Sequence, residues 1–195
     1  SITVGFQPDF TWIKSRSNAY NHQLVNSVVG YPDGTLLSDA TDAEYTAAAR
    51  VDSRDSNGFT ISTPAQVNLS GGTFAAWNWK AGGTASSNTD GSITSSVSAN
   101  VDAGFSIVSW TGTGANATVG HGLASAPQLI IAKNRDSTTE WPVLETIVNG
   151  ATKYLRLDGN YASTTTSIIW NNTNPTDSVF SIGTYSYINE NTKDI

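Results

Sequence analysis

An internal repeat constrains the fold of this 195-residue chain more than any other feature of its sequence. Motifs of the first half recur in the second half, in the same order and about 120 residues further along. The matched segments are Thr3-Val4-Gly5 with Thr118-Val119-Gly120, Pro8 to Arg16 with Pro127 to Arg135, Leu24 to Gly30 with Leu144 to Gly150, and Phe59 to Ile61 with Phe180 to Ile182. Order kept over a whole unit predicts two duplicated units.

The repeat also predicts that the two units differ at their ends. At an offset of about 121, Ile195 corresponds to Phe74, where an expected strand begins, so the second unit lacks its last strand. Residues 104–110 have no counterpart before Thr3. Two explanations remain open: the chain is a fragment of a longer polypeptide, or the units share strands or take them from a neighbouring chain at an open sheet edge.

Short alternating apolar segments bounded by Gly, Asn and Asp predict strands along most of the chain. The only helix expected is Thr41–Arg50, an Ala-rich stretch with a capping Thr or Asp. The expected strands are Phe10–Lys14, Gln23–Val29, Gly58–Ser62, Phe74–Lys80, Phe105–Trp110, Gln128–Lys133, Lys153–Leu157, Ser167–Trp170 and Val179–Gly183. Strands without long helices favour an all-β fold, an antiparallel β-sandwich of the jelly-roll or concanavalin-like kind.

This pattern divides the chain into three parts. Residues 1–80 form the first β repeat unit, and residues 104–195 form the second, which lacks its last strand. Between them, residues 81–103 are rich in Gly, Ser and Thr, which predicts a linker or a surface hairpin.

Charge and composition exclude several classes of protein. The net charge of −6 and the absence of a basic stripe argue against a nucleic-acid partner. No apolar run reaches the length of a membrane span, so we expect no membrane insertion. The acidic loops Asp39–Glu44 and Asp52–Gly58 do not match the spacing of a calcium-binding helix-loop-helix, and we expect no metal and no cofactor.

Catalytic patterns are weak in this sequence. No Gly-x-Ser-x-Gly elbow is present, and His121 has Phe6 as its repeat counterpart, so that position does not require an imidazole. Glu140 beside Trp141 is the best acid and aromatic pair for a glycosidase site, although a solvated acid beside a half-buried ring is the preferred interpretation. We therefore expect a non-enzymatic protein.

Aromatic residues in turn-rich segments are candidates to stack on sugar rings. These candidate glycan-stacking residues are Tyr20, Tyr31, Trp141, Tyr161 and Trp170. Trp77 and Trp79 are two positions apart on one expected strand and therefore share a face, which we expect to lie in the core or at an interface.

Several runs resemble repeat modules of large virion proteins from marine bacteriophages. The first module is carried by Pro8–Ser17, Asp55–Thr60 and Ala75–Gly83, and the next by Asn88–Ile93, Gly104–Val108, Thr118–Leu123 and Trp170–Thr173. The resemblance covers nearly the whole chain. It implies a jelly-roll or concanavalin-like sandwich and a structural role in a tail fibre, a spike or a capsid-surface appendage. It carries no catalytic motif.

Together these features predict a non-enzymatic phage virion structural protein that contributes to host-surface attachment, in the virion and outside the cell. We expect a homo-oligomer, with a trimer favoured, that contacts other virion proteins and binds a host-surface glycan, because weak sites on several copies combine. The alternatives are a carbohydrate-binding module of a surface protein and a glycan depolymerase.

Overall fold

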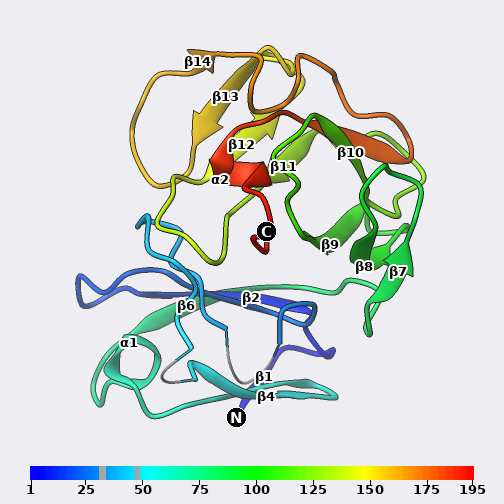
Figure 1. Ribbon diagram of the computed structural model, residues 1–195. Helices are drawn as coiled ribbons and strands as arrows, with labels where there is room; N and C mark the ends of the chain where they lie inside the picture. The colour runs from blue at the N-terminus through cyan, green and yellow to red at the C-terminus, as the bar shows by residue number, and fades with distance from the viewer. Residues whose placement is uncertain (31–33, 47–48) are drawn as a thin grey trace.

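The computed structural model describes residues 1–30, 34–46 and 49–195 (Figure 1). The fold is all-β and sandwich-like, with antiparallel sheets of two to four strands. The strands are β1 (Ile2–Thr3), β2 (Phe10–Ser15), β3 (Gln23–Asn26), β4 (Val51–Asp55), β5 (Gly58–Ile61), β6 (Phe74–Trp79), β7 (Ser86–Asn88), β8 (Ser95–Asn100), β9 (Phe105–Trp110), β10 (Ala117–Gly120), β11 (Leu129–Ile131), β12 (Pro142–Glu145), β13 (Lys153–Arg156), β14 (Thr164–Thr165) and β15 (Val179–Ile182). The helices are α1 (Ala65–Asn68) and α2 (Ser186–Asn189). Within the described ranges, no helix is long and apolar enough to cross a membrane.

The first half of the chain is a two-layer sandwich. One layer is the sheet β3-β2-β6, and the other is the sheet β1-β5-β4 with α1 beside it (Figure 1). Because β2 alternates, Ile13 points to the inner face, where it lies in one buried cluster with Val25, Phe59 and Val67 of α1. The opposite face of β2 carries Phe10 and Trp12.

The second half has two sheets and a core of its own. The sheet β11-β12-β13-β14 provides one layer, and β10 pairs with β15 in the other. Their inner faces meet in the largest cluster of the molecule, which includes Leu144, Phe180 and Ile188 of α2. A third cluster joins the two halves, because Leu24 and Leu36 pack with Trp141.

The segment 81–103 contains a hairpin, and Ile93 between its two strands lies in the core of the second half. It contains β7 and β8, and β8 continues into a second hairpin with β9 over the register Ser95↔Trp110 to Asn100↔Phe105. The three strands form their own sheet, at the right of the molecule in Figure 1.

Strand pairings recur at a constant offset along the chain. The β2–β3 register runs from Phe10↔Asn26 to Ile13↔Gln23, and the β11–β12 register begins at Leu129↔Glu145, with both partners 119 residues later. The bridges Leu24↔Leu36 and Thr35↔Tyr45 correspond in the same way to Val143↔Leu155 and Tyr154↔Thr164. By strand register, Leu24 therefore corresponds to Val143, whereas the sequence repeat matches it with Leu144.

The later elements correspond at an offset of 121. Residues of β5 and α1 match residues of β15 and α2 one for one. Each helix ends in an asparagine that makes an equivalent hydrogen bond. Asn68 Nδ2 donates to Ser62 O at 2.9 Å, and Asn189 Nδ2 donates to Gly183 O at 2.7 Å.

The helix predicted at Thr41–Arg50 is wrong for the residues that the structure describes; residues 47 and 48 lie outside them. Backbone groups of this segment bond across to other segments instead of along a helix. Tyr45 exchanges both backbone hydrogen bonds with Thr35, and the Thr41 carbonyl accepts the amide of Thr139. These tertiary bonds outweigh the helical preference of the alanines.

The strand predicted at Ser167–Trp170 is also wrong, because these residues form a turn. The carbonyls of Ile168 and Ile169 accept amides of the segment that follows β15, and the next two residues, Asn171 and Asn172, have φ values of 50° and 49°. Two successive residues in the left-handed region change the direction of the chain, so this segment does not continue as an extended strand.

Candidate binding site

A row of aromatic side chains crosses the outer face of the first sheet. We call Phe10, Trp12, Trp77, Trp79 and Phe105 the aromatic strip. Trp12 lies directly opposite Trp77, and Phe10 lies opposite Trp79, in the β2–β6 register. Directly paired residues of neighbouring strands project from the same face, so four of the rings lie side by side. Phe105, at the start of β9, extends the row.

The rings of the strip contact one another in fixed geometry. Phe10 and Trp79 have ring centroids 5.3 Å apart, and Trp79 and Phe105 are stacked at 6.1 Å with an interplanar angle of 21°. Trp12 meets Trp77 edge-on at 6.4 Å. Each such pair contributes about 0.5–1.5 kcal/mol beyond area burial, so the strip is held rigid before any ligand arrives.

The strip is buried at one side and open at the other. Phe10 and Trp12 pack against the cluster of Leu24, Leu36 and Trp141 that joins the two halves. Trp77 and Trp79 keep 49% and 37% of their surface exposed, because β6 is the edge strand of its sheet. The expectation of a core position is therefore wrong for these two indoles, and the alternative of an interface stays a prediction.

His22 fixes the orientation of the Trp12 indole. Trp12 Nε1 donates to His22 Nδ1 at 2.8 Å, which requires Nδ1 to be unprotonated. Burial lowers the pKa of His22, an effect that the nearby Lys14 reinforces and Asp39 opposes. The neutral imidazole that accepts the indole N–H is thereby favoured.

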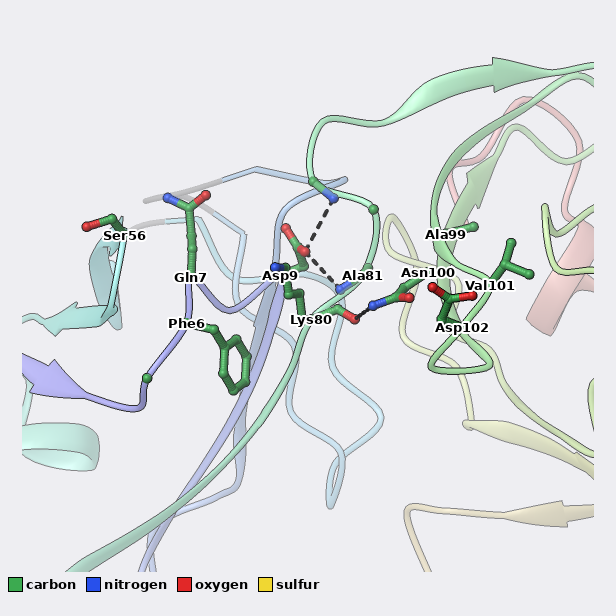
Figure 2. A pocket seen from close by; sticks show the side chains of 13 residues that line it. Phe6, Gln7, Asp9, Ser56, Lys80, Ala81, Ala99, Asn100, Val101 and Asp102 are labelled. Atoms are coloured by element: carbon green, nitrogen blue, oxygen red, sulfur yellow. Dashed lines mark hydrogen bonds between the residues drawn. The ribbon is translucent and has the colours of Figure 1, made fainter.

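A cavity of about 710 Å³ lies at the end of the strip, where β6 leads into the β7–β8 hairpin (Figure 2). Its wall is formed by Gly5 to Gln7, Asp9, Lys80 to Gly83 and Ala99 to Asp102, with Ser56 opposite. Lys80 follows Trp79 directly in the chain, so the same turn borders both the exposed indole and the cavity.

Asp9 organises the wall of this cavity. Its Oδ2 accepts the backbone amides of Ala81 at 2.8 Å and Gly83 at 3.3 Å, as Figure 2 shows, and its Oδ1 pairs with Arg54. The carboxylate is 3% exposed. Since both oxygens already have partners, Asp9 shapes the loop. The exposed polar side chains that line it are Gln7, Ser56, Lys80 and Asp102, and of these Gln7 already donates its Nε2 to Arg54 O at 3.2 Å.

Two of the predicted stacking residues are buried, so the expectation that they are exposed is wrong. Trp141 is 3% exposed, and its Nε1 donates to Ala40 O at 3.0 Å across the junction of the two halves. Trp170 is fully buried in the core of the second half. Turns carry both rings inward rather than outward, and neither ring can reach a sugar.

The other predicted stacking residues lie away from one another. Tyr161 is 59% exposed, with the Arg156 guanidinium 3.9 Å from the centre of one ring face. Tyr20 is half-buried in the β2–β3 loop, where its carbonyl accepts Lys14 Nζ. Tyr31 lies outside the described residues. No ring contact that the structure shows joins Tyr20 or Tyr161 to the strip.

The weighed catalytic residues have structural contacts. His121 is 2% exposed, and its Nδ1 accepts the amide of Leu123 at 3.1 Å. Glu140 forms an ion pair with Arg156 at 2.7 Å and accepts the Tyr154 hydroxyl at 3.3 Å. Within the described ranges, no group of three or more His, Asp or Glu side chains is placed to hold a metal ion.

One of three comparisons with known proteins relates the chain to a family. One family model, described as Domain of unknown function (DUF7483), matches residues 1–195. No curated protein and no solved structure matches the chain.

Proposed function

The chain belongs over residues 1–195 to the family described as Domain of unknown function (DUF7483). We propose that it is a non-enzymatic virion structural protein that attaches to a host-surface glycan. The aromatic strip is the proposed contact, with Trp77 and Trp79 as the stacking residues. The exposure of these two indoles, at 49% and 37%, is the observation that carries the proposal.

The chemistry of the strip suits a sugar ligand. The C–H faces of a pyranose ring are apolar and its hydroxyls are polar, so a sugar site combines flat rings with a few polar groups. Trp77 and Trp79 lie two residues apart on one strand, about 7 Å along its axis, which places two rings on one face. Lys80, which follows Trp79 in the chain, lines the neighbouring cavity together with Gln7 and Asp102, and these residues supply polar groups there.

The virion part of the proposal rests on the resemblance of the repeated runs to virion modules. Attachment by weak glycan sites requires several copies, because effective concentration multiplies the affinity of each site. The proposed assembly is a homo-oligomer, with a trimer favoured. Light scattering of the purified chain measures this directly, and a monomer that binds glycan would favour a carbohydrate-binding module instead.

A glycan array followed by titration of the best ligand tests the binding site. We expect Trp77→Ala and Trp79→Ala each to weaken binding by about tenfold, as truncation of an aromatic anchor does in other interfaces. Trp79→Phe keeps a ring against Phe10 and Phe105 and is expected to retain most of the affinity. Tyr161→Ala is the matched control, since it removes an exposed ring from the other half.

Two outcomes would overturn the proposal. The first is a protein that binds no glycan on a broad array while remaining folded. The second is glycan binding that survives both tryptophan substitutions and falls in Tyr161→Ala. A thermal scan of each variant separates loss of a binding ring from loss of the fold.

A further inference from the structure

The cavity at the end of the aromatic strip presents one cation and one anion that are not used by the fold. Lys80 and Asp102 both line it, and both are exposed. In the part of the chain that the structure describes, no hydrogen bond or ion pair engages the Lys80 ammonium or the Asp102 carboxylate, and the two do not pair with each other. Both groups are therefore available to whatever fills the cavity.

The turn that carries Asp102 is tied to the backbone of Lys80. Asn100 Nδ2 donates to Lys80 O at 3.1 Å, as Figure 2 shows. The Oδ1 atom of the same asparagine accepts the amide of Ala103 at 3.1 Å. The loop that follows Lys80 is held on its other side by the Asp9 carboxylate. A wall that is fixed before binding lowers the entropy cost of taking up a ligand.

The cavity adjoins the aromatic strip on the same face of the molecule. Asn100 of the cavity wall lies directly opposite Phe105 of the strip in the β8–β9 register. Directly paired residues project from the same face. Since Phe105 in turn stacks on the exposed Trp79, a ligand that extends beyond Trp79 and Phe105 reaches the cavity. The cavity volume of about 710 Å³ lies within the range of small-molecule sites, about 300–1,000 Å³.

The charges around the cavity cancel. Lys80 and Asp102 contribute one charge of each sign, and the Asp9 carboxylate pairs with the Arg54 guanidinium. The whole chain carries a net charge of −6. The field of a negatively charged protein repels a polyanion, and a cavity without net charge does not compensate for this repulsion. An acidic polysaccharide is therefore a poor ligand for this surface.

A separate cation and anion suit the hydroxyl groups of a neutral sugar. A hydroxyl both donates and accepts, so one sugar unit donates to Asp102 and accepts from Lys80, whereas a carboxylate only accepts. A sugar with a carboxylate in place of its primary hydroxyl leaves Asp102 without that donor and adds a second negative charge, which Asp102 repels. The half-buried ring of Phe6 lines the same cavity and offers an apolar surface to the C–H groups of the sugar.

We propose that this cavity is a second subsite of the glycan site and takes an uncharged sugar unit of the chain that stacks on Trp79. Hydroxyls of this unit donate to Asp102 and accept from Lys80. The substrate class is therefore an extended neutral oligosaccharide or polysaccharide, and not an acidic one. This inference rests on the proposed function, because it assigns the cavity to the same glycan that the strip binds.

Oligosaccharides of two lengths test the subsite by isothermal titration calorimetry. The probes are two-unit and five-unit oligomers of glucose, mannose and galactose, each beside the oligomer of the corresponding uronic acid, which carries a carboxylate in place of the primary hydroxyl. We expect a five-unit neutral oligomer to bind about tenfold more tightly than its two-unit form, because only the longer chain reaches the cavity. Lys80→Met keeps the aliphatic stem and is expected to weaken binding of the five-unit oligomer about tenfold, with little effect on the two-unit form.

The substitution Asp102→Asn tests the selection against acidic sugars. It keeps the shape of the side chain and removes its negative charge, so we expect the preference for a neutral oligomer over its uronic acid counterpart to fall about tenfold. Asp177→Asn is the matched control, because Asp177 is exposed in the second half of the chain and the same charge is removed away from the cavity. This variant is expected to keep the preference of the parent protein.

Four results contradict the second subsite and leave the proposed function intact. They are equal affinity for the two lengths, unchanged five-unit binding in Lys80→Met, tighter binding of the uronic acid oligomers than of the neutral ones, and an equal change of preference in Asp102→Asn and Asp177→Asn. Absence of binding for every oligomer, neutral or acidic, contradicts the proposed function and this inference together. A thermal scan of each variant establishes that it is folded.

Discussion

Asn189 provides a sharp test of how the second half is held together. Its side chain is fully buried. Nδ2 donates to Ala115 O at 2.6 Å and to Gly183 O at 2.7 Å, while Oδ1 accepts the amide of Thr113 at 2.8 Å. One amide thus ties the loop after β9 to the end of β15. Asn68 holds the corresponding place in the first half, but it is exposed and makes only the bond to Ser62 O among those that the structure shows.

The expected cost follows from this difference. Asn189→Ala strands the buried carbonyl of Gly183, which costs about 1–3 kcal/mol, and removes two bonds to an exposed loop, at about 0.5–1.5 kcal/mol each. The sum is a loss of about 2–6 kcal/mol in the free energy of unfolding. Asn68→Ala removes one solvent-accessible bond and is expected to cost about 0.5–1.5 kcal/mol.

Urea denaturation followed by tryptophan fluorescence measures both variants. Trp110 and Trp170 lie in the core of the second half and report on its unfolding. Asn189→Asp is an informative third variant, because it keeps the shape and replaces two donors by a carboxylate oxygen that faces two carbonyls. If Asn189→Ala loses no more stability than Asn68→Ala, the contacts of this buried amide do not hold the second half together.

Three further predictions concern other buried or crowded groups. Burial lowers the pKa of Lys133 to about 8, so the unfolded chain binds more protons between pH 8 and 10.5 and the Lys133 contribution to the free energy of unfolding should rise with pH there, by about 1–3 kcal/mol; denaturation of Lys133→Met across this window should lack this rise. Gly82→Ala places a Cβ 2.4 Å from a backbone carbonyl of β8, and should lower the melting temperature through a loss of about 1–3 kcal/mol; an unchanged melting temperature would contradict this contact. Burial raises the pKa of Glu145, but hydrogen bonds from the following backbone amides lower it by more. The ionised carboxylate therefore stabilises the fold, and this contribution to the free energy of unfolding should be lost as pH falls through the folded pKa. Asn26 accepts two amides in the corresponding turn, so Glu145→Asn should keep the turn and abolish this acid dependence in an acid titration of stability.

The alternation of apolar residues was sufficient to predict the strands that carry a buried face. Phe10–Lys14 and Phe74–Lys80 are confirmed as β2 and β6, because side chains on one face of each strand line a core. Of the two paired strands β10 and β15, only β15 was predicted from the sequence. The residues of β10, Ala117–Gly120, have too few apolar side chains for alternation to identify them, and their partner in β15 supplies the pairing.

Side-chain exposure in the turns was not predictable from local sequence. Trp141 and Trp170 stand in turn-rich segments, yet one packs across the junction of the halves and the other fills a core. Trp77 and Trp79 stand in an apolar strand, yet they are exposed. In each case the deciding factor is which element lies opposite the ring, and that depends on residues more than fifty positions away, such as Ala40 for Trp141.

The contact between Trp12 and His22 gives the aromatic strip an intrinsic optical reporter. The indole donates to Nδ1, so the proton of the neutral imidazole resides on Nε2. Acidification places a second proton on Nδ1 and turns the acceptor into a donor, which breaks the bond and puts a cation beside an indole whose ring centroid lies 5.7 Å from that of the imidazole in this structure. An imidazolium at that range quenches indole emission. The fluorescence of Trp12 therefore carries a pH-dependent signal from the inner side of the strip, without any label attached to the protein.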